Sequence, residues 1–552
     1  MDPLPTAPFP EEHLTVTALL IHNARVLTMD ETNPEADAVA VRDGRVVLAG
    51  TAERARAAAG PEAAEVDAGG RTLVPGFIDP HNHLLSTAES LAAVDARYPR
   101  VSSVADLAEV IAAEAERTPA GQWIRAFSMD DAKYPEGRPT RRALDEATSE
   151  HPVIVYHVSG HQAVVNSMSL AWSGVGEDVT DPEGGSFVRD EGGRLTGMVL
   201  DSAMELLLPL AVDIGCHGPN FHTALPAEQL LGWLADAADP YLSAGVTTVC
   251  DPQVSARELR VYRAARTAGS LPLRTFGMPL SHQLDALTQA GLASPFGDDW
   301  LRLTGMKFYA DGSLLGGTAK FSTPYGERGE LAGSLYHHPD QLTDLVTRAA
   351  GEGWQVAIHT QGDAAMEHSL AAIASASRVS GPDARPRLEH CGYPTPEQAK
   401  RFTDFGVIPV NQPNFLYDSG GDFLRRLGGR AHRLQPMREE LDLGLRPVLS
   451  SDSFVSSLRP MDTIANAVGR TTREGEEIGT DQAVTLHEAL RAHTLDAAHA
   501  LGVEDRLGSV RPGHLADLVV LDADVRTLAP DRLRHVNAWL TVLDGRVVHR
   551  AA

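Results

Sequence analysis

The stretch PGFIDPHNHL, residues 75–84, sets two histidines directly behind a short apolar run. Residues 76–79 have the composition of a buried strand, and His81 and His83 follow it two positions apart. In an extended chain, side chains two positions apart point to the same side. The stretch therefore predicts a strand end at which two imidazoles face one shared target.

Strand-like apolar runs alternate with alanine-rich helical stretches through the middle of the chain. Repeated alternation over roughly 400 residues predicts a parallel sheet, and at this length a closed (β/α)8 barrel of the TIM type is favoured. Ten runs are present where a barrel needs eight, so about two belong to insertions, and residues 160–240 with their DPEGG turn form one such insertion. Besides residues 75–84, the runs are 123–129, 152–158, 246–251, 273–278, 303–312, 355–363, 386–392, 406–414 and 446–453.

The pentapeptide DGRVV occurs near both ends of the chain, at residues 43–47 and 544–548. Each copy follows a β-rich run, and Asp-Gly between such runs is a hairpin turn signal. Two unrelated hairpins are the alternative, but the flanking runs favour one small β-sandwich domain built from both termini. The α/β chain is thus predicted to divide into an N-terminal part of this domain at 14–70, the barrel at 71–505, and a C-terminal part at 506–552.

Polar side chains recur just past the apolar part of these runs. The C-terminal strand ends of a parallel barrel meet at one mouth, so we expect these side chains to face one another. Four imidazoles and a carboxylate make a site that suits one or two Zn²⁺ ions, and also Fe, Mn or Ni. The predicted ligands are His81, His83, Lys307, His359, His390 and Asp452.

Each of these residues also has an ordinary explanation. A single strand histidine is more often a hydrogen-bonded core residue than a ligand, and Asp452 in SSDS is placed to cap a helix. Five strand ends that carry such residues in order favour one shared metal site over separate explanations. By contrast, His487, His493 and His499 are six residues apart on a predicted helix, where ligands need spacings of three or four, so they receive no role.

Composition limits the partners and the compartment. The net charge of −26, from 48 basic and 74 acidic residues, repels polyanions, so we expect a small-molecule substrate and neither nucleic acid nor a membrane. Three cysteines without a CxxC pair exclude a disulfide framework and fit a reducing compartment. Without a leader pattern in the first residues or an apolar run of about 18 residues, the sequence predicts a cytoplasmic protein, and homo-oligomerisation stays open.

Several longer motifs, taken together, resemble the amidohydrolase superfamily, in the branch that contains the N-substituted formamide deformylases (amidohydrolase family 3). Their order along the chain matches that family, and they extend from about residue 20 to residue 548. Besides PGFIDPHNH and SSDS, they are PVIVYHVSGHQAVVNS, DPEGGSFVRDEGGRLTGMV, MKFYADGSLLGGTA, IHTQGDAA, RLEHCG and GSVRPGHLADLVVLD. The resemblance implies a metal-bearing barrel with a composite β-domain.

The resemblance also implies a role for the lysine. In related amidohydrolases a lysine at this strand end is carboxylated by CO₂, and the two carbamate oxygens bridge two metal ions; Lys307 matches that position. The implied sets are His81, His83, Lys307 and Asp452 around one metal, and Lys307, His359 and His390 around the other. The alternative is that Lys307 pairs with the nearby acid Asp311.

Further roles follow from the same resemblance. Asp452 is expected to act as the general acid and base, taking a proton from metal-activated water and handing it to the leaving nitrogen. His161, Asp311 and Gln412 are expected at the substrate. Where the family often has a basic or bulky residue after the Gly-Asp of IHTQGDAA, this chain has Ala364, so the pocket lining does not carry over.

We therefore expect a metal-dependent hydrolase that cleaves a non-peptide carbon–nitrogen bond of a small amide. Hydrolysis of esters, lactones or organophosphates is an alternative, because the same site activates water for either reaction. A catalytically silent barrel that only binds a ligand is a further alternative, which the complete set of strand-end ligands disfavours.

Overall fold

The computed structural model describes residues 18–207, 210–381 and 383–552. Residues 14–17, which open the predicted N-terminal domain, lie outside the described residues, as does the N-terminal segment searched for a leader. Among the described helices, none is both long and apolar enough to cross a membrane.

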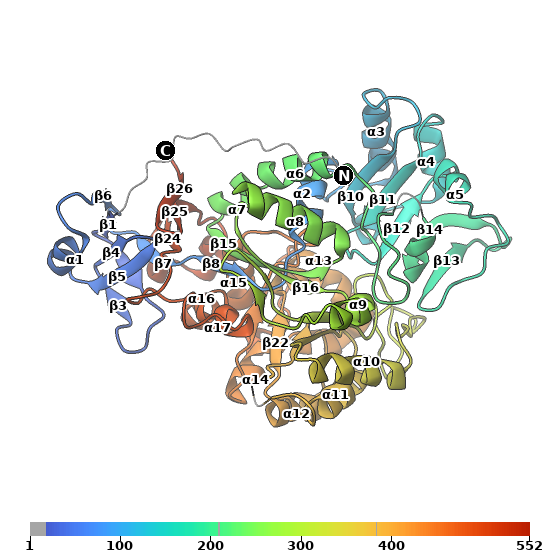
Figure 1. Cartoon of the computed structure of the whole chain (residues 1–552). Helices are drawn as coiled ribbons and strands as arrows, with labels where there is room; N and C mark the ends of the chain where they lie inside the picture. The colour runs from blue at the N-terminus through green and yellow to red at the C-terminus, as the bar shows by residue number, and fades with distance from the viewer. Residues whose placement is uncertain (1–17, 208–209, 382) are drawn as a thin grey trace.

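Eight parallel strands of the described chain form the barrel (Figure 1). They make two hydrogen-bonded arcs, one from β8 to β16 and one from β19 to β23. A parallel bridge between Leu280 and Lys307 joins the arcs on one side, and the Asp452 N–H donates to the His81 carbonyl at 2.9 Å on the other. The strands are β8 (Phe77–Asp79), β15 (Val246–Val254), β16 (Arg274–Pro279), β19 (Met306–Tyr309), β20 (Val356–His359), β21 (Arg387–Glu389), β22 (Ile408–Asn411) and β23 (Val448–Leu449). The predicted (β/α)8 barrel is confirmed.

Local sequence signals set the boundaries of the surrounding helices. Helix α8 (Ala256–Ala268) begins at Ser255 with a capping box to Glu258 and ends at Gly269 in the left-handed conformation. Helix α12 (Pro396–Phe405) repeats this with Thr395, Gln398 and Gly406. The other helices that follow barrel strands are α10 (Pro339–Gly351), α11 (Asp363–Ala376), α13 (Pro413–Leu427) and α15 (Pro460–Gly469). Sharp helix ends keep the connections short, so each strand end opens at the barrel mouth.

A six-stranded sheet is inserted between β8 and β15. The runs at 123–129 and 152–158 belong to it, and they are the two of the ten apolar runs that stand outside the barrel. The sheet begins at residue 94, ahead of the segment 160–240 that was predicted as an insertion. Its strands are β9 (Val94–Asp95), β10 (Ile124–Met129), β11 (Val153–His157), β12 (Gln162–Val165), β13 (Gly185–Arg189) and β14 (Leu195–Asp201).

Both ends of the described chain build the predicted β-sandwich domain. One sheet has the order β5-β4-β1-β6, and the other has the order β26-β25-β24-β7-β2-β3, in which β24 pairs antiparallel with β7. Blue N-terminal and red C-terminal strands accordingly lie side by side in Figure 1. The strands are β1 (Ala18–His22), β2 (Arg25–Leu27), β3 (Glu35–Ala36), β4 (Ala38–Arg42), β5 (Arg45–Gly50), β6 (Ala64–Asp67), β7 (Thr72–Pro75), β24 (Leu518–Leu521), β25 (Ala538–Leu543) and β26 (Arg546–Arg550).

The two DGRVV segments are the turns of two hairpins in this domain. Asp43 and Gly44 have φ values of 50° and 74°, and Asp544 and Gly545 have 53° and 75°. Positive φ at both central residues is the requirement of a type I′ turn, which Asp-Gly satisfies at low steric cost. The Ala516 carbonyl accepts from the Gly545 N–H at 3.0 Å, and the Ala516 N–H donates to the Gly44 carbonyl at 2.8 Å. The repeat therefore marks two turns that meet.

Candidate metal centre and active site

Five of the predicted ligands line one pocket at the barrel mouth. His81 and His83 follow β8, His359 is the last residue of β20, and His390 and Asp452 follow β21 and β23. Each side chain thus extends from the C-terminal end of a strand or the residues just beyond it. The convergence expected from a parallel barrel is what the pocket wall shows.

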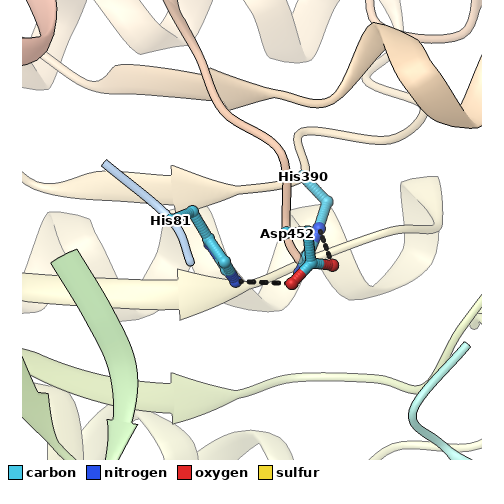
Figure 2. Close-up of side chains that lie close together, drawn as sticks. All are labelled: His81, His390 and Asp452. Atoms are coloured by element: carbon cyan, nitrogen blue, oxygen red, sulfur yellow. Dashed lines mark ion pairs between the residues drawn. The ribbon is translucent and has the colours of Figure 1, made fainter. Parts of the chain in front are cut away.

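The Asp452 carboxylate lies at the centre of the cluster. Its Oδ1 is 3.3 Å from His81 Nε2 and 3.1 Å from His83 Nε2, and its Oδ2 is 3.8 Å from His390 Nδ1. Figure 2 shows His81 and His390 pointing at this carboxylate from two sides. The nearest helix, α15, has Arg459 at its N-cap, so Asp452 does not cap it and the helix-capping alternative is set aside.

The remaining imidazoles extend the cluster. The ring centroids of His359 and His390 are 4.4 Å apart, and those of His81 and His390 are 4.8 Å apart. Burial holds the pKa of His359 and of His390 well below the ordinary histidine value. A neutral imidazole is the form that ligates metals, so these two rings are ready to bind a cation.

Opposite charges act on the other two groups. Although burial alone would lower it, hydrogen bonds to the carboxylates of Asp251 and Asp452 raise the pKa of His83 to about 9. Burial would likewise raise the pKa of Asp452, but the neighbouring His81 imidazole holds it well below the ordinary value. The carboxylate is therefore ionised and available at neutral pH.

Lys307 is fully buried in β19 beneath this cluster. Its Nζ makes no hydrogen bond to any described residue and lies 4.9 Å from the centre of the Tyr309 ring. Burial lowers its pKa to about 8. A buried ammonium without hydrogen bonds is costly, so the position calls for a compensating group.

The residues present fit a bound divalent cation. One donor atom each from His81, His390 and Asp452 lie within 4.8 Å of one another, and all three residues are buried. Imidazole nitrogen with carboxylate oxygen is a donor set typical of zinc and of related transition metals. The unpartnered Lys307 Nζ lies under the same cluster, as a group awaiting a ligand would.

Asp311 and Gln412 have internal partners and do not line the pocket. The Asp311 carboxylate accepts the backbone N–H groups of Gln361 at 2.9 Å, Gly362 at 2.9 Å and Lys320 at 2.7 Å. Within the described residues no ion pair joins it to Lys307, so the alternative pairing of these two residues is not what the structure has. The role left to Asp311 is to hold the loop after β20.

Gln412 supports a predicted ligand instead of facing the pocket. Its Oε1 is 3.0 Å from His390 Nδ1, and its Nε2 donates to Ser450 Oγ at 2.8 Å. The amide thus fixes the orientation of the His390 ring from behind. Among the three predicted substrate contacts, His161 alone is in the pocket wall.

Glu389 and Arg387 were not predicted, and they hold His81 from below. His81 Nδ1 contacts the Glu389 carboxylate, which accepts Arg387 Nε at 2.7 Å and Nη2 at 3.0 Å. Arg387 also donates to the Pro80 carbonyl at 2.8 Å. A carboxylate on the second nitrogen fixes the tautomer and orientation of a metal-binding histidine. The signal in the sequence was RLE, because two opposite charges two apart in a buried strand share a face.

Two of the site residues have left-handed backbone. His390 has φ 71° and Asp452 has φ 54°, although neither is glycine. Such conformations persist where the surroundings determine them, and they cluster at functional sites. At both positions the chain leaves a strand and turns its side chain into the mouth.

A second cluster, Asp130, Asp131 and His157, lies on the inserted sheet. His157 Nδ1 accepts the Ser159 N–H at 3.1 Å, and His157 Nε2 faces Asp131 Oδ1 at 3.1 Å. Arg138 donates to the other Asp131 oxygen at 2.8 Å. Both imidazole nitrogens therefore have protein partners, and this cluster behaves as a structural network.

The pocket wall opposite the cluster is apolar. Among the lining residues of the described chain, Asp452 is the sole aspartate, glutamate, lysine or arginine. The apolar part of the wall consists of Phe221, Leu314, Leu315, Phe415, Leu416, Phe423, Leu434, Phe454 and Val455, with Pro219 beside them. The pocket thus joins a charged metal end to an apolar end.

Comparison with known proteins gives a consistent result. The model of the amidohydrolase family matches residues 64–549. N-substituted formamide deformylase of Arthrobacter pascens is 32% identical over 536 residues, covering 96% of this chain and 97% of that protein. Protein LONG AFTER FAR-RED 3 of Arabidopsis thaliana is 30% identical over 527 residues, covering 92% and 88%. The crystal structure of a metal-dependent hydrolase from Pyrococcus horikoshii superposes with a TM-score of 0.74 at 25% identity, covering 93% of this chain and 99% of that one.

The support beneath His81 gives a first prediction. We expect Glu389→Gln to weaken Zn²⁺ affinity by ~10–100-fold, because a neutral amide leaves Arg387 unbalanced and holds the His81 ring less firmly. Titration of the metal-free protein against a competing chelator measures this affinity, and circular dichroism monitors the fold.

The matched control is Glu440→Gln. Glu440 is as fully buried as Glu389 but bonds to Asn411 at 2.9 Å, away from the histidines. This variant should keep its metal affinity. A natively folded Glu389→Gln protein with wild-type affinity would show that the Glu389 carboxylate does not support the site.

Proposed function

Because the chain belongs to the amidohydrolase family, and so is a hydrolase of carbon–nitrogen bonds other than peptide bonds, we propose that it cleaves small, uncharged N-substituted formamides at a divalent-metal centre. The observation that carries the proposal is the two-ended pocket, with imidazoles and one carboxylate at one end and phenylalanine and leucine side chains at the other. The relative from Arthrobacter pascens supports the choice of formamides.

The metal would be held by the strand-end residues. We assign His81, His83, Lys307 and Asp452 to one ion and Lys307, His359 and His390 to a second, with zinc as the proposed metal because nitrogen donors predominate. A bound divalent cation lowers the pKa of water toward ~7 and polarises a carbonyl oxygen. Water activation at neutral pH is what hydrolysis of an unactivated amide requires.

We propose that Lys307 is carboxylated. The support is chemical: its Nζ is unpartnered, and burial lowers its pKa to about 8, which raises the fraction of neutral amine able to add CO₂ with loss of a proton. The product is an anionic carbamate, which replaces an uncompensated cation with two oxygen ligands. Protein kept in ¹³C-bicarbonate should show a carbamate carbon signal by NMR, and Lys307→Ala should lack it. Absence of the signal in active wild-type protein would exclude the modification.

Asp452 is proposed as the proton carrier. Its carboxylate lies 3.1 Å from His83 Nε2 and 3.3 Å from His81 Nε2, on the pocket wall where water and substrate meet. An ionised carboxylate takes the proton of the attacking water, and the resulting acid returns it to the departing nitrogen. Protonation matters because an amine anion is a very poor leaving group.

The apolar wall is proposed to select the nitrogen substituent. No lysine or arginine among the described lining residues is available to pair with an acidic substituent, and burying an unpaired charge is costly. Alkyl and aryl substituents instead remove apolar surface from water when they enter. The formyl group then faces the metal end.

A substrate panel tests the function. We expect the zinc-loaded protein to release formate and amine from N-alkyl and N-aryl formamides, with much slower turnover of formamides that carry a carboxylate on the substituent. Chelation should abolish the activity, and zinc should restore it. Exclusive turnover of lactones or esters, or none of any compound by metal-loaded protein, would overturn the proposal.

A second test separates catalysis from metal binding. Asp452→Asn keeps the size and one oxygen but carries no proton, so we expect turnover to fall by ~10²–10⁴-fold while the imidazoles still retain metal. Kinetics on the best panel substrate and elemental analysis of the same preparation provide the two readouts. Asp422→Asn removes an equally buried carboxylate, each side chain being 5% exposed, and should stay near wild type. Near wild-type turnover by Asp452→Asn would remove it from the mechanism.

A further inference from the structure

His161 is held in the pocket wall by two residues with no assigned function. Its Nδ1 is 2.8 Å from Asp201 Oδ1, and the Tyr336 hydroxyl donates to the same oxygen at 2.8 Å. The Asp201 N–H also donates to the His161 carbonyl at 2.7 Å. All three residues are buried, with 5% or less of each exposed. The His161 ring is therefore fixed through both side chain and backbone.

This arrangement determines which ring nitrogen faces the substrate. A carboxylate accepts only, so the proton of the imidazole sits on Nδ1, toward Asp201. Nε2 has no hydrogen-bond partner among the described residues, and the ring lines the pocket with its centroid 5.0 Å from that of His359. In this tautomer Nε2 presents a lone pair to the pocket.

The three residues come from separate parts of the fold. His161 precedes β12 and Asp201 ends β14, both in the inserted sheet, while Tyr336 follows β19 of the barrel. Asp201 has φ 49°, a left-handed conformation uncommon for a residue other than glycine. The inserted sheet thus delivers one oriented acceptor to a pocket whose metal end belongs to the barrel.

We infer that His161 is a further catalytic residue whose Nε2 accepts the N–H of a secondary amide substrate, and that Asp201, assisted by Tyr336, is the positioning residue that sets its tautomer. The inference rests on the proposed amide hydrolysis and narrows its substrate class to amides with one hydrogen on nitrogen. A site built to bond an N–H discriminates strongly against an analogue without it, because a buried acceptor is then left unpaired.

The specificity test compares a matched substrate pair, an N-alkyl formamide and the same compound with an added N-methyl group. Zinc-loaded wild type should prefer the secondary amide in kcat/KM by about 10-fold or more. The preference should disappear in His161→Ala. It should also disappear in Asp201→Asn, whose amide can donate to Nδ1 and move the proton to Nε2. His161→Gln, which still offers an acceptor, should recover part of the preference, and Asp422→Asn should keep it.

Double variants and spectroscopy distinguish positioning from general destabilisation. If Asp201 acts through His161, the double variant His161→Ala/Asp201→Asn should be no less active than His161→Ala alone. ¹⁵N NMR of the histidine rings should show the His161 proton on Nδ1 in wild type and on Nε2 in Asp201→Asn. This second readout needs no turnover, so it stands even if formamides prove not to be substrates.

The outcomes separate cleanly. Active wild type without preference for the secondary amide overturns the inference and leaves the proposed function intact. A wild-type His161 with its proton on Nε2 also overturns it. Additive losses in the double variant would show that Asp201 does not act through His161. Metal-loaded protein that hydrolyses no amide refutes the proposed function and the substrate class together.

Discussion

One backbone hydrogen bond closes the barrel and creates the site. The Asp452 N–H donates to the His81 carbonyl at 2.9 Å, and Ser451 beside it donates its N–H to Asp79 Oδ1 at 3.1 Å. These contacts join the first barrel strand to the last, across more than two-thirds of the chain. Without closure, the two halves of the ligand cluster would stand on separate sheet edges. The metal end therefore depends on a completed barrel, and the large loop-closure entropy is offset by the sheet and core that form with it.

Charge balance inside the barrel depends on partners that do not touch the pocket. Arg387 and Glu389 neutralise each other beneath His81, whereas Lys307 has no hydrogen-bond partner. Breaking a buried pair leaves an uncompensated charge, which is strongly destabilising. The arrangement is consistent with a structural pair that orients the ligands and a lysine that is left for chemistry. A buried lysine of lowered pKa fits that second role.

The work of the pocket is divided among the parts of the fold. The barrel supplies the four imidazoles and Asp452 from its strand ends, and the inserted sheet supplies His161 with Asp201. The composite β-domain stands apart from the pocket. It is tied to the barrel by Arg274, whose Nε donates to Asp517 Oδ2 at 2.7 Å. Changes in the inserted sheet can therefore alter specificity while the metal chemistry is kept.

The sequence alone determined the features that depend on local pattern. Side-chain alternation made His81 and His83 share a face, the Asp-Gly pairs specified both I′ turns, and ordered polar strand ends predicted the ligand cluster. It did not reveal which two of the ten apolar runs leave the barrel, because the runs at 123–129 and 152–158 are as apolar as the barrel strands and hydrogen-bond partners are a long-range choice. Nor did it assign Asp201 to His161, Gln412 to His390 or Glu389 to His81. Each of those contacts joins residues 22 to 308 positions apart, so only the tertiary structure decides which buried polar groups become partners.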